Sequence, residues 1–126
     1  MLRWQPPLDD VAFLLGPWLR AGDDWKRIPR FATLDIDTAE AVLAEAGRFC
    51  AEVLAPLNAV GDVQGCRLVD GLVRTPDGFA QAYRRYVADG WPALARDPAW
   101  GGQGLPALLE LAFTEMQVGA NHAWTM

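Results

Sequence analysis

Apolar residues recur at three- and four-residue steps between about Asp37 and Leu57, which is the spacing of one face of an α-helix. The stripe consists of Val42, Leu43, Ala46, Phe49, Cys50, Val53, Leu54 and Leu57. Asp37 can accept from the first-turn amides and Glu40 can reach back to it, as in a capping box. Pro56 lacks an amide donor and would end the helix. The pattern therefore predicts an amphipathic helix from about Asp37 to Leu54, whose apolar stripe needs a partner helix.

Two more amphipathic helices are predicted in the second half of the chain. One has Thr75 as its cap and Pro76 in its first turn, and it stops at Gly90. Its apolar face carries Phe79, Ala82, Tyr83, Tyr86 and Val87. The other runs from near Pro106 to near Gly119, and its apolar face carries Leu108, Leu109, Ala112, Phe113 and Met116. These two faces are suitable partners for the first stripe.

The segment between the first two helices predicts a turn and a small hairpin. Residues 61–65 read as the turn, and residues 67–75 read as two very short strands around Asp70-Gly71. An Asp-Gly pair supplies the positive backbone angles that a tight hairpin needs. A hairpin this small must rely on the helices for its stability. The predicted fold class is all-α, an amphipathic helical bundle with a small β-hairpin.

Residues 1–34 are predicted to be an N-terminal extension packed on this bundle. Prolines at positions 6, 7, 17 and 29 interrupt the apolar spacing and leave room only for short helical turns. We expect the extension to be held by Trp4, Phe13, Trp18 and Trp25. Residues 35–126 are expected to form the helical domain, incomplete at its C-terminal end because the chain stops just after Trp124 without a polar, turn-rich tail.

Composition and charge narrow the classes of partner. The chain has 126 residues, 52% of them hydrophobic and 21% charged, which suits one globular unit. A net charge of -5 disfavours nucleic acid as a partner. The longest apolar run near the N-terminus, Val11 to Leu15, is too short for a membrane span or a signal peptide, so we expect a cytoplasmic protein without a membrane segment.

Few residue types suited to catalysis or metal binding are present. Cys50 and Cys66 have no metal-binding spacing, and a buried thiol is expected at Cys50. His122 lacks a local carboxylate to orient it as a base, so packing or solvation is expected for it. Glu110 and Glu115 lie five residues apart on different helix faces and are not a paired acid and base. No metal site and no catalytic residue is predicted.

The glycine-rich segment 100–106, Trp-Gly-Gly-Gln-Gly-Leu-Pro, admits two interpretations. Glycines before a helix can bring backbone amides close to a phosphate, as in a nucleotide or CoA. The segment lacks the preceding strand of a dinucleotide fingerprint and the Gly-Lys-Ser or Gly-Lys-Thr ending of a Walker loop. A tight connection into a packed helix is therefore the preferred interpretation. Of the six tryptophans, Trp100 and Trp124 are expected to be exposed and Trp91 is expected to anchor the loop.

The ordered set of segments resembles the N-terminal domain of the acyl-CoA dehydrogenases. The matching stretches are residues 37–46, Val53-Leu54-Ala55-Pro56-Leu57-Asn58, Gly61-Asp62, Thr75-Pro76-Asp77-Gly78-Phe79, Tyr83, Gly90-Trp91, Gly101-Gly102-Gln103-Gly104-Leu105-Pro106, Glu115-Met116 and Ala120-Asn121. The leading segment 4–10 resembles the extension of the longer bacterial members. Each piece is weakly specific, but together they cover nearly the whole chain.

The resemblance implies a subunit with a helical N-terminal domain, a middle β-domain and a C-terminal helical domain, in a homo-oligomer that binds FAD at a subunit interface. Such flavoproteins oxidise an acyl-CoA to the trans-2-enoyl-CoA in fatty acid β-oxidation, and many pass electrons to an electron-transfer flavoprotein. The catalytic base and most FAD contacts belong to regions outside this chain. We therefore expect no FAD bound to this chain alone.

The same resemblance indicates what this chain contributes, which is the wall of the acyl pocket formed by the helix after the glycine loop. The candidate substrate-binding residues are Phe113, Met116, Gln117 and Glu115. The expected partners are the remaining flavin and catalytic domains and the acyl-CoA substrate. Two alternatives remain open: a free-standing helical interaction or assembly module with no catalysis, and an independent hydrolase or binding protein that uses the glycine loop for CoA phosphate.

Overall fold

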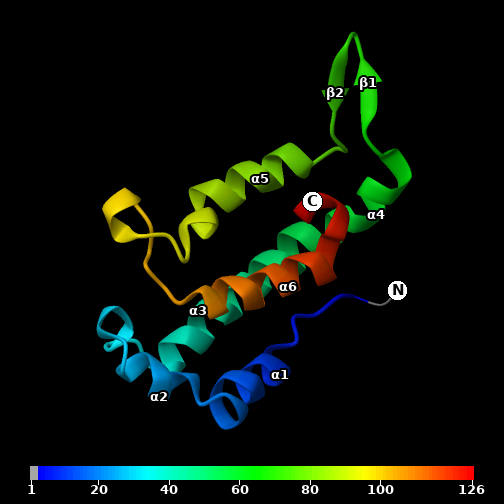
Figure 1. Cartoon of the computed structure of the whole chain (residues 1–126). Coiled ribbons are helices and arrows are strands. Elements are labelled where there is room, and N and C mark those ends of the chain that lie inside the picture. The colour runs from blue at the N-terminus through cyan, green and yellow to red at the C-terminus, as the bar shows by residue number, and fades with distance from the viewer. Residues whose placement is uncertain (1–2) are drawn as a thin grey trace.

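The longest helical stretch of the chain runs without a break from Ile36 to Gln64 and forms the spine of the bundle (Figure 1). In the computed structural model, which describes residues 3–126, it comprises α3 (Ile36–Phe49), one π-helical turn (Cys50–Leu54) and α4 (Ala55–Gln64). The prediction that the helix ends at Pro56 is wrong. The π turn shifts the hydrogen-bond register just before Pro56, which then lies in the first turn of α4, where a missing amide costs little.

The cap of α3 also differs from the prediction. Asp35, not Asp37, is the N-cap: its Oδ1 accepts from the backbone amide of Thr38 at 2.7 Å. Asp35 has the extended backbone that a cap residue needs, whereas Asp37 already lies inside the first turn. The hydrogen bond to Thr38 lowers the pKa of the Asp35 carboxyl below its usual value. Asp37 therefore acts only through its charge near the positive end of the helix.

The helix that follows the glycine loop, α6 (Ala107–Thr125), lies against α3, the π turn and α4 (Figure 1). The predicted start near Pro106 is confirmed, but the predicted end near Gly119 is wrong. The helix continues past a kink at Asn121, where φ is −160° and ψ is 90°. The core between these helices contains Leu43, Leu54, Leu109, Phe113 and Met116, each at most 2% exposed.

Asn121 holds this kink against the spine. It is buried, its Nδ2 donates to the carbonyl of Leu54 at 3.1 Å, and its Oδ1 accepts from the amide of Trp124 at 3.0 Å. The Leu54 carbonyl belongs to the π turn. Trp124 is partly buried and its indole Nε1 donates to the carbonyl of Phe79 at 3.1 Å, so the prediction of an exposed Trp124 is wrong. One polar residue thus joins the two longest helices.

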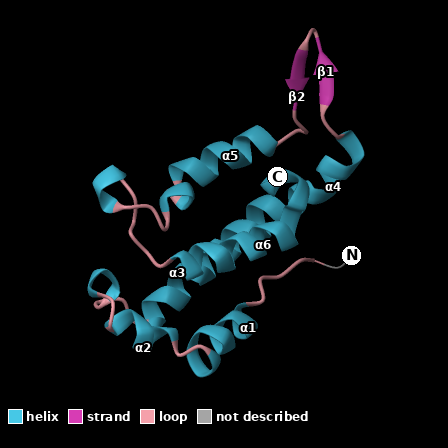
Figure 2. Cartoon of the chain, viewed as in Figure 1, coloured by secondary structure: helices cyan, strands magenta, loops and turns pink. Residues whose placement is uncertain are grey.

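The hairpin projects away from the helices (Figure 2). Strands β1 (Arg67–Val69) and β2 (Leu72–Arg74) pair antiparallel around the predicted Asp70-Gly71 turn, where both residues have positive φ. Its base is closed by two hydrogen bonds: Gln64 Nε2 donates to Asp77 Oδ2 at 3.0 Å, and the Asp77 amide donates to Gln64 Oε1 at 2.8 Å. All strand side chains are exposed, so the strands do not pack on the helices. The prediction that the hairpin relies on the helices for its stability is therefore wrong.

After the hairpin, α5 (Phe79–Ala88) begins later than predicted. Gly78 precedes it with φ at +86°, and no side chain caps the helix, so the predicted cap at Thr75 is wrong. The predicted turn at 61–65 is only partly present. Gly61 is helical, and a Cβ there would lie 2.7 Å from the Phe79 ring, so this glycine lets α5 approach α4. The chain leaves the helix at Gly65.

The N-terminal segment forms the predicted short turns: α1 (Leu8–Phe13), a π turn (Leu14–Trp18), α2 (Ala21–Lys26) and a 3₁₀ turn (Pro29–Phe31). Trp25 is buried and Trp4 packs on the core, as predicted. Phe13 and Trp18 are 53% and 70% exposed, so their predicted anchoring role is wrong. Their places in the core are taken by the buried residues Val11, Leu15 and Phe31.

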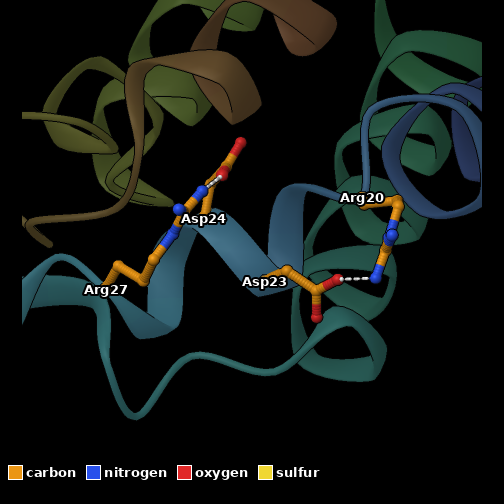
Figure 3. A network of polar contacts seen from close by, with 4 residues as sticks. All are labelled: Arg20, Asp23, Asp24 and Arg27. Atoms are coloured by element: carbon orange, nitrogen blue, oxygen red, sulfur yellow. Dashed lines mark hydrogen bonds and ion pairs between the residues drawn. The ribbon is translucent and has the colours of Figure 1, made fainter.

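Two of the basic residues of this segment, Arg20 and Arg27, are paired with acids. Figure 3 shows Arg20 with Asp23, where Nη2 and Oδ2 are 2.7 Å apart, and Arg27 with Asp24. All four side chains are more than half exposed, so these pairs contribute little to stability. They do cancel positive charge that a phosphate backbone would otherwise meet. No helix in the described part of the chain has the length and apolar character needed to cross a lipid bilayer.

Candidate functional site

A groove of about 620 Å³ runs along α6 where this helix meets α5 and the loop that joins them. It is lined by Tyr86, Trp91, Arg96, Ala107, Leu108, Glu110, Leu111, Phe113, Thr114 and Gln117. The first two of these residues come from α5 and from the 3₁₀ turn after it (Trp91–Ala93), and the last seven belong to α6. The groove therefore depends on the packing of segments that are distant in the sequence.

The floor of the groove is aromatic. The ring centroids of Trp91 and Phe113 are 4.8 Å apart, and those of Tyr86 and Phe113 are 6.2 Å apart. Phe49 of α3 and Trp124 pack on the same rings from below, at 6.4 Å from Phe113 and 5.6 Å from Tyr86. Such pairs add about 0.5–1.5 kcal/mol each beyond the burial of their area. The floor is therefore a stiff apolar surface.

Three polar groups lie within this apolar surface: the Gln117 carboxamide, the Tyr86 hydroxyl and the indole Nε1 of Trp91, which is buried without a hydrogen-bond partner in the structure. Gln117 is only 6% exposed, yet it lines the groove together with Tyr86. Burial raises the pKa of the Tyr86 hydroxyl, and a side-chain contact with Gln117 partly offsets the rise. The phenol therefore stays neutral at physiological pH. A carboxamide and a phenol can both form hydrogen bonds, so the groove has a polar spot in its floor.

The rim of the groove carries an ion pair. Arg96 Nη2 donates to Glu110 Oε1 at 2.7 Å, joining the loop to the first turn of α6. The Arg96 side chain is 64% exposed and that of Glu110 is 28% exposed, so the pair remains in contact with solvent. Its contribution to stability is at most about 1 kcal/mol. Its effect is to place charge at the groove edge while leaving the floor apolar.

The structure brings together two of the four predicted substrate-binding residues. Phe113 and Gln117 are four positions apart and lie on the same side of α6, where they line the groove. Met116 is buried in the core cluster, and Glu115 is exposed, and neither lines the groove. Tyr86 and Trp91 complete the floor. In the sequence, Tyr86 lies on an apolar helix face and Trp91 follows a glycine. Both patterns predicted packing rather than a binding site.

The glycine loop uses its amides internally. The backbone amides of residues 101–105 donate in turn to the carbonyls of Pro98, Asp97, Ala93, Arg96 and Leu94, at 2.9–3.1 Å. A Cβ at Gly102 would lie 2.0 Å from the Arg96 oxygen. The glycines thus permit a tight connection into α6, as preferred from the sequence, and these amides are not free to bind a CoA phosphate. The described residues accordingly contain no amide cradle here that fits the phosphates of FAD.

The two cysteines and the histidine do not line the groove. Cys50 is buried, and burial raises the pKa of its thiol to about 12. His122 is exposed on the last turns of α6, and Cys66 is exposed next to the hairpin. Within residues 3–126, no group of three or more His, Cys, Asp and Glu side chains is placed to hold a metal ion. The carboxylate that lines the groove, Glu110, is paired with Arg96.

No model of a known protein family matches the chain. The chain is 36% identical over 118 residues to the 3-methylmercaptopropionyl-CoA dehydrogenase of Ruegeria pomeroyi. The match covers 91% of this chain and 19% of that enzyme, so the chain spans about a fifth of the length of this curated relative.

Proposed function

We propose that this chain is the helical part of an acyl-CoA dehydrogenase that forms one wall of the site for the acyl group. The observation that carries the proposal is the groove: an aromatic floor containing Phe113 and Gln117, in a chain 36% identical over 91% of its length to a dehydrogenase of an acyl-CoA. The predicted roles of Met116 and Glu115 are not part of this proposal, because neither residue lines the groove.

The groove's own residues bind and shield an acyl chain. Each CH₂ group transferred from water to the aromatic floor contributes about 0.8 kcal/mol. Covering the floor with an acyl chain also removes water from the partly exposed rings of Tyr86 and Trp91. The Arg96–Glu110 pair keeps the rim polar, which favours a ligand with an apolar end in the groove and a polar end outside it. An acyl thioester of CoA has this distribution.

The proposal assigns the oxidation of the substrate to residues and a flavin outside this chain, because the amides of the glycine loop are bonded within the loop and the Glu110 carboxylate of the groove is paired with Arg96. The first substrate to test is 3-methylmercaptopropionyl-CoA, which the name of the relative specifies for that enzyme. In this proposal the chain positions the acyl group, and the rest of the dehydrogenase performs the reaction.

The proposal is tested by a visible spectrum of the chain purified together with the protein region encoded downstream of it. A flavin band that bleaches when 3-methylmercaptopropionyl-CoA is added without oxygen supports the dehydrogenase. Leu111→Arg puts a charge at the groove wall and should weaken bleaching at low substrate concentration. Ala123→Arg places the same charge on exposed α6 surface away from the groove and should leave bleaching unchanged. Flavin that never bleaches with any acyl-CoA would refute the proposal.

A free-standing interaction or assembly module is the second candidate, and the hairpin favours it. Leu68, Val69, Leu72 and Val73 are between 43% and 76% exposed, an unusual concentration of apolar side chains on so small a sheet. If no flavin copurifies in any combination, this second candidate becomes the better explanation of the fold.

A further inference from the structure

The indole of Trp91 lines the groove with a hydrogen-bond donor that has no acceptor. Among the described residues 3–126, its Nε1 is the buried side-chain nitrogen or oxygen without a hydrogen-bond partner. An indole N–H can only donate, and it usually finds an acceptor when a tryptophan is buried. Leaving it unpaired away from water is unfavourable, so such a group in a folded protein needs an explanation. The groove beside the ring is the place from which an acceptor can come.

Trp124 shows how the same chain satisfies another indole of the same aromatic cluster. Both tryptophans are partly buried, and each ring centroid is 6.4 Å from that of Phe49. The Nε1 of Trp124 donates to the backbone carbonyl of Phe79 at 3.1 Å. Trp91 has no such carbonyl, although its ring is closely packed, with its centroid 4.8 Å from that of Phe113. The unpaired donor therefore belongs to the tryptophan that lines the groove, and not to the cluster as a whole.

We infer that Trp91 Nε1 donates a hydrogen bond to a carbonyl oxygen of the acyl-CoA in the groove, and so fixes how far this ligand enters. The inference rests on the proposed function and assigns a positioning residue to it. An acyl-CoA has carbonyl oxygens in its thioester and in the amides of its pantetheine arm. No hydrogen bond restrains the indole, so a small rotation of the ring brings its N–H to an oxygen that lies along the groove.

The position of Trp91 along the groove suits a carbonyl. Its ring packs on Phe113, which lies three positions after Glu110 on α6. The charged rim formed by Glu110 and Arg96 is therefore about 5 Å away along the helix axis. A carbonyl bound at Trp91 leaves the polar part of the ligand near this rim and the hydrocarbon part on the aromatic floor. The hydrogen bond thus marks the boundary between the two parts.

The two tryptophans provide a matched pair of variants. Trp91→Phe keeps an aromatic ring in the floor and removes the unpaired donor. Since one neutral hydrogen bond changes affinity by about fivefold, this variant should bind pentanoyl-CoA about fivefold more weakly. Trp124→Phe also removes an indole N–H, but one that already has the Phe79 carbonyl as its partner, so the affinity should stay unchanged. Circular dichroism checks that both variants fold.

The direct test is a ¹H–¹⁵N NMR titration of the full chain that follows the indole N–H signals. The Trp91 signal is assigned through the ring protons of Phe113, which lie close to it. We expect this signal to move downfield as pentanoyl-CoA binds, whereas the Trp124 signal stays in place. A second titration uses S-pentyl-CoA, which lacks the thioester carbonyl and keeps the pantetheine amides. The same movement with this analogue identifies an amide as the acceptor, and its loss identifies the thioester.

The outcomes separate this inference from the proposal on which it rests. Backbone shifts at groove residues with an unmoved Trp91 indole signal would overturn the role of Trp91 and leave the acyl wall standing. This readout uses the wild-type chain, so a Trp91→Phe chain that fails to fold does not rescue the inference. Absence of groove shifts with either ligand would overturn the acyl wall, and the role of Trp91 with it.

Discussion

Asn121 offers the sharpest test of how the bundle is held together. Replacing it with alanine removes the hydrogen bond to the Leu54 carbonyl and the one from the Trp124 amide. The Leu54 residue is fully buried, so its carbonyl would lose its side-chain partner away from water, at a cost of about 1–3 kcal/mol. The Trp124 amide lies near the partly exposed end of α6 and adds about 0.5–1 kcal/mol. The expected total loss of unfolding free energy is therefore about 1.5–4 kcal/mol.

This loss can be measured by urea unfolding followed through tryptophan fluorescence and circular dichroism. With a typical urea dependence for a small domain, the midpoint of Asn121→Ala should fall by roughly 1–2 M. Asn58→Ala is the control, because Asn58 is exposed on α4 and its replacement should change stability by no more than about 0.5 kcal/mol. If both variants unfold at the wild-type midpoint, Asn121 does not join the two helices as described.

Three further perturbations test other parts of the structure. Gly102→Ala must move the loop backbone, because its Cβ would meet a carbonyl oxygen at 2.0 Å, so its thermal midpoint should fall well below that of Gly16→Ala, where the space is open. The Cys50 thiol should resist iodoacetamide at pH 8 until urea unfolds the chain. Since its folded pKa of about 12 exceeds the ordinary thiol value of 9.0, stability should fall as pH rises from about 9 toward 12, and less so in Cys50→Ala. Trp25→Ala should cost about 3–5 kcal/mol in urea unfolding, whereas Trp100→Ala, at a residue 90% exposed, should cost almost nothing.

The helices were predictable because their apolar stripes are long, but the points where they change direction were not. The π turn at Cys50–Leu54 carries the same apolar spacing as the helix before it, so Pro56 was read as an end when it begins a new register. The kink at Asn121 could likewise not be predicted, because it depends on a hydrogen bond to the carbonyl of Leu54, 67 positions earlier in the sequence. Local sequence patterns predict which segments are helical and which face of each helix is apolar, whereas tertiary contacts decide where the helices bend.

The candidate site was likewise predictable only in part from the sequence. Phe113 and Gln117 were predicted through the resemblance of the helix after the glycine loop to a known family, and their four-residue spacing places both on the groove side. Met116 was predicted to line the same wall. It precedes Gln117 by one position, and the corresponding rotation about the helix axis points its side chain into the core. The contributions of Tyr86 and Trp91 could not be read from the sequence, because they arise only when these rings, from α5 and the turn after it, meet Phe113 of α6.

The two hydrogen bonds between Gln64 and Asp77 make the hairpin an independent appendage of the bundle. Since its ends are tied together at the base and its strand side chains are exposed, residues inserted between Asp70 and Gly71 would lengthen a loop whose closure is already secured. Doubling the length of such a loop costs only about 0.6 kcal/mol of closure entropy. The tip is therefore a natural attachment point for a fluorophore or an affinity tag, which would report on whatever approaches the hairpin without disturbing the groove.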